Sequence, residues 1–543
     1  MGGGLLQIAA YGAQDVYLTG DPQITFFKVV YRRHTNFSME SIQQQFSGKV
    51  GFGKSDLSCT ISRNGDLVNS MILQVTLPQL PTGCRWIEHV GHRLIKSVRI
   101  NLGGDTIDEH NGRWFEIWNQ LTHDDSMKKA YDEMVGYPNL SDTGGPGWKP
   151  TGSIDGEQTL YIPLQFWFNR NPGLSLPLIA LQYHEVKVIF NFEDLGKLVV
   201  WPVTGTGVAG WSASALTSLE DGGPYINNAG DPTTLTGGIS GLASSWKTAL
   251  QTAGREFTAN LYVDYIYLDT EERKRFAQMS HEYLIDQLQI HGKETLTSYS
   301  HRMRLNFNHP VKELIWVFEP PEGDYITFGA GEAFNFSYHI NHRSGFNTGA
   351  DVDVSNQVKY RWGNFGEITK ETETDIYEWM KDAKLQINGH DRFSTRPGSY
   401  FRRVQPYQFH GGVPDVPIYV YSFALRPEEF QPSGTCNFSR IDNAYLELNL
   451  KKFLSPMQYV ADPSVANIGP RVPYYSMANP GNNLSTSAQS QLGGFTFTTG
   501  PPANGTVAQP TWQTDNKLHL YAYAVSYNVL KIVSGRGGLA YSN

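Results

Sequence analysis

Cysteine is scarce in this sequence, and the few cysteines form no recognisable framework. Cys59, Cys84 and Cys436 are the three in 543 residues, and no C-x-x-C pair occurs. A zinc site built on cysteines or a disulfide scaffold needs paired or closely spaced cysteines. The sequence therefore predicts neither of them, and it is typical of a chain that folds in a reducing compartment.

Runs of basic residues are lacking as well. Charged residues make up 18% of the chain, and the formal net charge is −8 at pH 7. A protein that coats DNA displaces condensed counterions with a cationic surface. We therefore expect no direct binding of nucleic acid.

Long apolar stretches are also missing. None approaches the roughly 20 residues that a membrane-spanning helix needs, and the opening MGGGLLQ lacks the basic and apolar regions of a secretory signal. We expect no membrane insertion and no entry into the secretory pathway.

Turn-forming and aromatic residues, by contrast, are plentiful. The chain has 54 Gly and 29 Pro, and 13% of its residues are aromatic, which is typical of many strands joined by turns. In AYLELNL (444–450) the three leucines alternate with Tyr445, Glu447 and Asn449, as in a half-buried strand of an antiparallel sandwich. The predicted strands are 71–80, 94–102, 184–192, 259–269, 313–320, 444–450 and 518–532.

Helical patterns are few. Segment 113–134 places four apolar residues on one helical stripe, namely Trp114, Ile117, Trp118 and Leu121. Segment 269–280, DTEERKRFAQMS, opens with an Asp–Thr cap and two glutamates directly after a strand. We interpret it as a helical connector, which places a domain boundary near 270–285.

The two halves of the chain resemble each other. INLGGDTIDEHNGRWF (100–115) and INGHDRFSTRPGSYF (387–401) both run from Ile-Asn through a glycine turn to Asp, and later to Gly, an aromatic residue and Phe. Each half closes on a tyrosine-rich strand that follows a polar, Gly-rich insertion, at 195–256 and 454–516. One repeat of this length predicts a duplicated all-β sandwich.

One string matches a phosphate-binding loop. GKVGFGKS (48–55) satisfies G-x-x-x-x-G-K-[ST] with Lys54 in the lysine position. Such a loop works only between a buried strand and a helix whose amides hold the phosphates. The following DLSCTISRNGDL alternates like a strand and continues into a predicted hairpin turn at Asn64–Gly65. We therefore interpret the string as coincidental and reject a P-loop ATPase.

The remaining motifs also have ordinary interpretations. GTGVAG (205–210) fits G-x-G-x-x-G without a βαβ pattern around it. The pairs His89/His92 and His339/His342 have H-x-x-H spacing but lie in no helical pattern, so we expect strand or loop histidines. DTIDEH (105–110) is interpreted as a turn. We predict no catalytic, cofactor-binding or metal-binding residues.

Several long stretches resemble the major capsid protein of nucleocytoplasmic large DNA viruses, the group with irido-, phycodna- and mimivirus-like families. They occur in family order over nearly the whole chain, at 2–40, 52–78, 166–188, 308–317, 432–448 and 534–543. The insertions at 195–256, 323–380 and 454–516 are not covered by the resemblance.

The resemblance implies an all-β fold of two consecutive eight-stranded antiparallel jelly rolls, with long loop insertions and few short helices. We expect an N-terminal arm (1–24), a first jelly roll (25–270), a connector (271–285) and a second jelly roll (286–543) with a C-terminal tail (533–543). Residues 433–442 would then turn the chain into a core strand.

The function implied by the resemblance is structural. Family members form homotrimeric, pseudo-hexagonal capsomers that tile an icosahedral shell in the virion, assembled in the host cytoplasm. The expected partners are the chain itself, neighbouring capsomers, and penton and minor capsid proteins; an internal membrane beneath the shell is compatible with this function. Loops are candidates for contact with the host surface. A double β-sandwich that binds glycans for host attachment is the alternative.

Overall fold

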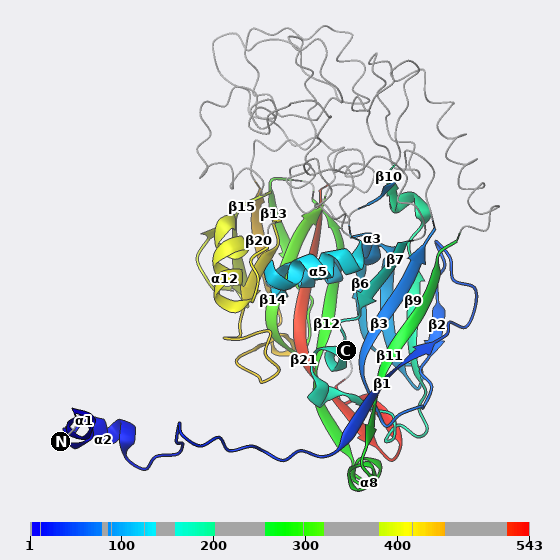
Figure 1. The fold of residues 1–543 in the computed structure, drawn as a ribbon. Helices are drawn as coiled ribbons and strands as arrows, with labels where there is room; N and C mark the ends of the chain where they lie inside the picture. Colours follow the sequence, from blue (N-terminus) through cyan, green and yellow to red (C-terminus); the bar gives the residue numbers. More distant parts are fainter. Residues whose placement is uncertain are drawn as a thin grey trace, which may run out of the picture.

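The computed structural model contains two β-sandwiches whose ribbons lie next to each other (Figure 1). It describes residues 3–10, 12–78, 85–87, 89–123, 125–136, 158–200, 256–296, 298–319, 379–414, 416–450 and 518–541. The predicted insertion 454–516 lies outside these residues. Of the insertions 195–256 and 323–380, the structure describes only the ends, 195–200, 256 and 379–380.

The first sandwich has two antiparallel sheets, with strand orders β1-β11-β3-β7 and β2-β9-β5-β6. Its principal strands are β1 (Phe37–Gln44), β2 (Leu57–Thr60), β3 (Leu67–Leu77), β5 (Ile95–Leu102), β6 (Asp105–Asn111), β7 (Gln158–Pro163), β9 (Val186–Phe192) and β11 (Thr258–Leu268). Short strands add β8 (Leu176–Pro177) beside β3 and pair β4 (Arg85–Trp86) with β10 (Val199–Val200).

The second sandwich repeats this arrangement, with strand orders β12-β21-β14-β18 and β13-β20-β15-β16. Its principal strands are β12 (His281–Thr295), β13 (Ser300–Arg304), β14 (Pro310–Glu319), β15 (Met380–Ile387), β16 (His390–Asp391), β18 (Tyr419–Ser422), β20 (Ala444–Leu450) and β21 (His519–Val533). Short strands β17 (Arg396–Pro397), β19 (Cys436–Asn437) and β22 (Arg536–Leu539) pair with β15, β14 and β21. Because both halves thread their sheets in the same order, the predicted duplication is confirmed.

Helices are short; two precede the first strand, and the others lie between strands. They are α1 (Gly3–Ala9), α2 (Asp15–Thr19), α3 (Val90–Leu94), α4 (Gly112–Thr122), α5 (Asp125–Val135), α6 (Trp167–Arg170), α8 (Thr270–Gln278) and α12 (Gln405–Phe409), with single turns η1 (Pro172–Leu174), η2 (Leu195–Lys197), η4 (Tyr400–Val404) and η5 (Phe438–Arg440). In the part of the chain that the structure describes, no helix is long and apolar enough to cross a membrane.

The predicted helix 113–134 is two helices, because the backbone becomes extended at His123, after α4. All four residues of its apolar stripe are buried, as predicted. Helix α8 begins where expected, with the Asp269 carboxylate accepting a hydrogen bond of 2.7 Å from the Thr270 amide, and it links β11 to β12.

The hairpin predicted at Asn64–Gly65 is wrong. Strands β2 and β3 belong to different sheets, so the chain crosses from one sheet to the other between them. Gly65 lies against the ring of Tyr265, where a Cβ atom would come within 2.8 Å of the tyrosine Cβ. The glycine is therefore needed for close approach to β11 rather than for a hairpin turn.

The sandwiches share a hydrophobic core. Strand β14 is buried on both faces: Leu314, Trp316 and Phe318 point into the second sandwich, while Ile315 and Val317 join the core of the first. Strand β21 divides in the same way, with Tyr521, Tyr523 and Val525 in the core of the first sandwich. The sheet of β12, β21, β14 and β18 thus has apolar packing on two sides, and the two sandwiches form one unit.

Candidate functional site

The loop around Lys54 has none of the geometry that phosphate binding requires. Lys54 is exposed, and its carbonyl oxygen accepts a hydrogen bond of 2.8 Å from the Phe192 amide. Strand β2 follows, antiparallel to β9, where a phosphate-binding loop needs the start of a helix. The strand predicted to follow GKVGFGKS is confirmed. The other strings, GTGVAG (205–210) and the pair His339/His342, lie outside the described residues.

The interpretation of 105–110 as a turn is wrong: the segment forms strand β6, and the turn lies just before it, at Gly103 and Gly104. Asp108 has a further role that the sequence did not indicate. Its Oδ1 accepts a hydrogen bond of 3.1 Å from the Leu288 amide on β12, and its Oδ2 lies 3.0 Å from His110 Nε2. The carboxylate therefore joins the first sandwich to the second.

A buried ion pair crosses the same junction. The Arg113 guanidinium on α4 donates two hydrogen bonds of 2.7 Å to the Glu319 carboxylate at the end of β14. The guanidinium also lies over the ring of Tyr521, 3.7 Å from its centroid. Both charged side chains are largely buried, with 12% and 4% exposed. Bidentate geometry and the aromatic face fix the relative position of the two sandwiches.

A second set of buried ionisable side chains, centred on His410, lies at the end of α12. His410 Nε2 is 3.1 Å from Glu313 on β14, and His410 Nδ1 is 2.9 Å from Glu428. Burial favours the neutral imidazole, but the charge of Glu313 and the hydrogen bonds of both carboxylates outweigh it and raise the pKa of His410 to about 9.

Stability should therefore fall at alkaline pH. The folded pKa of His410 lies above its ordinary 6.5, so the stabilisation is complete below about pH 6.5 and is lost as pH rises through about 9. A shift of this size corresponds to about 3 kcal/mol. We expect the urea midpoint of the wild type to drop more steeply between pH 6.5 and 9 than that of His410→Gln, whose amide does not titrate. Equal slopes in the two proteins would contradict this role of His410.

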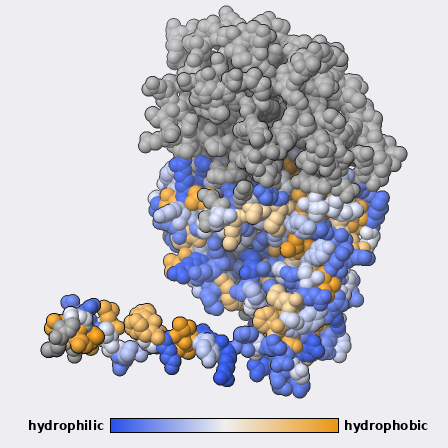
Figure 2. Space-filling model, in the orientation of Figure 1, coloured by the Kyte–Doolittle hydropathy of each residue, from blue (hydrophilic) through white to orange (hydrophobic). Residues whose placement is uncertain are grey.

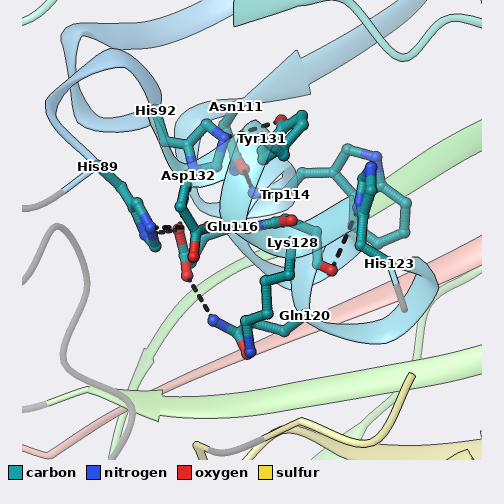
Figure 3. Close-up of polar contacts among 11 residues, drawn as sticks. His89, His92, Asn111, Trp114, Glu116, Gln120, His123, Lys128, Tyr131 and Asp132 are labelled. Atoms are coloured by element: carbon teal, nitrogen blue, oxygen red, sulfur yellow. Dashed lines mark hydrogen bonds and ion pairs between the residues drawn. The ribbon is translucent and has the colours of Figure 1, made fainter. Parts of the chain in front are cut away.

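A polar cluster lies where α3, α4 and α5 meet (Figure 3). The Oε2 atom of Glu116 on α4 is 2.9 Å from His89 Nδ1 and 2.8 Å from His92 Nδ1. The outer ring nitrogens have their own contacts: His89 Nε2 lies 3.1 Å from Asp132 Oδ1, and His92 Nε2 lies 2.9 Å from the Tyr131 hydroxyl. All five side chains are buried.

The electrostatics of the cluster follow from burial and from these contacts. Burial lowers the pKa of His92. Burial also acts against the charged form of His89, but the Glu116 charge and hydrogen bonds to Asp132 and Glu116 outweigh it and raise the pKa of His89 to about 10. For Glu116, the nearby histidines overcome burial and hold its pKa well below the ordinary range. His89 and Glu116 are therefore the charged pair of the cluster.

The cluster corrects one statement made from the sequence. His92 lies in helix α3, so the expectation of a strand or loop is wrong for it, whereas His89 lies in the turn before the helix, in a left-handed conformation. The pattern failed to reveal the helix because it has only five residues. The H-x-x-H spacing was a valid signal, whereas Glu116 and Asp132 follow at distances along the chain that match no motif.

The N-terminal segment (residues 3–36) is a long exposed feature. Every described residue in it is exposed, and Figure 1 shows it extending away from the sandwiches before β1 begins. Figure 2 shows hydrophobic residues spread along it. Its exposed large apolar residues are Leu5, Leu6, Ile8, Val16, Tyr17, Leu18, Ile24, Phe26, Phe27, Val29, Val30 and Tyr31.

Comparisons with known proteins cover the whole chain. The sequence model described as "Major capsid protein N-terminus" matches residues 25–269, and the one described as "Large eukaryotic DNA virus major capsid protein" matches residues 272–467. The major capsid protein of Phaeocystis pouchetii virus is 40% identical, with 100% of both chains covered. That of Paramecium bursaria Chlorella virus 1 is 38% identical at the same coverage.

A solved structure gives the same result for the fold. A chain of the quasi-atomic model of the PBCV-1 virus capsid aligns with a TM-score of 0.60 and 34% identity, covering 96% of this chain and 100% of that one.

Proposed function

This chain belongs to the family of major capsid proteins of large eukaryotic DNA viruses, and from that premise we propose that it forms homotrimers that act as pseudo-hexagonal capsomers of an icosahedral shell. Its double jelly-roll fold and its place in the virion capsid agree with the resemblance seen in the sequence. The glycan-binding alternative receives no support from these comparisons.

The observation that carries the proposal is the repeated sandwich. Both halves have the same strand order, and the core of the first sandwich includes side chains from the facing sheet of the second, so each subunit is one block with two similar lobes. Three such blocks around a threefold axis present six similar lobes, which is the shape that fills a hexagonal lattice. Closed sandwiches also limit the exposed strand edges through which β subunits would otherwise aggregate.

We place the boundary between the jelly rolls within 271–285. Helix α8 lies there, and the two family matches end and begin at 269 and 272. An arm of 1–24, jelly rolls of 25–270 and 286–543, and a tail of 533–543 complete the proposed division.

The same proposal covers the partners. Neighbouring capsomers, penton proteins and minor capsid proteins contact the outer surfaces, an internal membrane fits beneath the shell, and loops contact the host surface. The net charge of −8 supports a wall that does not bind the genome directly, and the scarcity of cysteine supports assembly in the host cytoplasm. We assign no catalytic step to the protein.

The mass of the purified chain in solution tests the proposal. We expect light scattering to give three times the chain mass of 60.8 kDa, because a capsomer needs an obligate interface of about 2,000 Å² or more. A monomer at micromolar concentration would overturn the trimer. Retention of that monomer on immobilised glycans would instead favour the attachment protein.

A further inference from the structure

We propose that His89, His92 and Glu116 bind a divalent transition-metal ion, zinc by their ligand chemistry, which fastens α3 to α4. The proposal goes beyond the capsid role and reverses the expectation of ordinary histidines. The site is made of imidazole and carboxylate groups, which zinc accepts together in proteins.

The ligand atoms already converge. One candidate atom from each of the three residues lies within 4.8 Å of the others, and all three side chains are buried. The Nδ1 atoms of both histidines point at the same oxygen of Glu116, at 2.8 and 2.9 Å (Figure 3). Tetrahedral ligands of zinc stand about 3.3 Å apart, so the ion fits once the two Nδ1–Oε2 contacts lengthen from 2.8 and 2.9 Å to about that spacing.

An outer layer orients the three ligands. A histidine that binds metal through one nitrogen commonly donates its other N–H to a carboxylate or another acceptor. Here, Asp132 lies 3.1 Å from His89 Nε2, and the Tyr131 hydroxyl lies 2.9 Å from His92 Nε2. The Gln120 amide donates a hydrogen bond of 3.0 Å to the second oxygen of Glu116. Both Nδ1 atoms are thus left to face the centre.

Charge also favours a cation. Glu116 and Asp132 place two carboxylates beside the histidines, and both side chains are buried, where unpaired negative charge is costly. A divalent ion between the ligands pairs with this charge.

The backbone holds the histidines in place. His89 has a φ of 48°, a left-handed conformation that is uncommon for residues other than glycine. Such strain is retained where the surroundings require it, often at functional sites. Gly112 at the start of α4 lies so close to the His92 carbonyl oxygen that a Cβ atom there would overlap it. This contact brings the two helices together at the cluster.

Metal analysis of the full-length wild type tests the site directly. The protein is stripped with a chelator, incubated with zinc chloride, passed through a desalting column and analysed by mass spectrometry for metals. We expect about one zinc per chain. A folded wild type that retains no zinc overturns the proposal, whether or not any variant folds.

Variants then locate the ion. We expect His92→Gln and Glu116→Gln to lose zinc, and Asp132→Asn in the outer layer to bind it about 10- to 100-fold more weakly. His410→Gln is the matched control, because it removes a buried histidine with two carboxylate contacts but without a second histidine. Folding of each metal-free variant is checked by circular dichroism. Unchanged zinc in folded His92→Gln and Glu116→Gln would refute the assignment.

Discussion

Replacing Arg113 with methionine is expected to lower the free energy of unfolding by about 3–5 kcal/mol, measured by urea denaturation, because it leaves the buried Glu319 carboxylate without its bidentate partner. The Glu319 side chain is only 4% exposed, so water cannot replace the lost hydrogen bonds. The variant also loses the packing of the guanidinium on Tyr521. Because the pair joins the two sandwiches, the lost free energy is stabilisation of the junction between them.

Two further variants test whether the loss of stability in Arg113→Met comes from the unpaired Glu319 carboxylate. Adding Glu319→Leu to Arg113→Met removes the stranded carboxylate and should recover most of the loss. Lys531→Met breaks an exposed ion pair of similar length, 2.9 Å to Glu282, and should cost less than about 1 kcal/mol. If Arg113→Met costs no more than Lys531→Met, the ion pair does not secure the junction.

The sequence predicted the strands well because alternation is local information. In AYLELNL, each leucine is buried and Asn449 is exposed, as the pattern indicated. Strand β14 shows what the local pattern cannot predict. Its continuous apolar run is typical of burial on both faces, but nothing in the run tells that Ile315 packs into one sandwich and Trp316 into the other.

The junction and the polar cluster could not be predicted in the same way. Arg113 and Glu319 are 206 residues apart, and Glu116 follows His92 by 24. A single sequence carries no signal for such pairs, because only the crossing of the chain between sheets brings them together. The mistaken hairpin at Asn64–Gly65 has the same origin, since Asn-Gly indicates a turn but not which sheet the next strand joins.

Deletion of residues 1–34 is expected to leave the sandwiches folded and to weaken self-association by a thousandfold or more. No described residue of the N-terminal segment is buried, so its loss removes no core packing. Three of its aromatic residues, Tyr17, Phe26 and Phe27, are 91%, 87% and 98% exposed. Aromatic rings held in water favour burial against another surface, and in a capsomer the nearest such surface belongs to a second copy of the chain. Burying three rings contributes about 4 kcal/mol or more, which is about three powers of ten in the association constant.

Sedimentation velocity over a range of concentrations measures this effect, and the melting temperature of the dissociated chain reports its folding. The double variant Phe26→Ser with Phe27→Ser should reproduce much of the loss, because the effect resides in apolar side chains rather than in chain length. Leu425→Ser is the matched control: it removes an apolar side chain that is 73% exposed on the body of the protein, outside the segment. Equal association of the deletion and the wild type would show that the sandwiches alone hold the capsomer together. Because the segment is fully exposed, we expect the deletion to fold. A deletion that fails to fold would show instead that the segment stabilises the subunit.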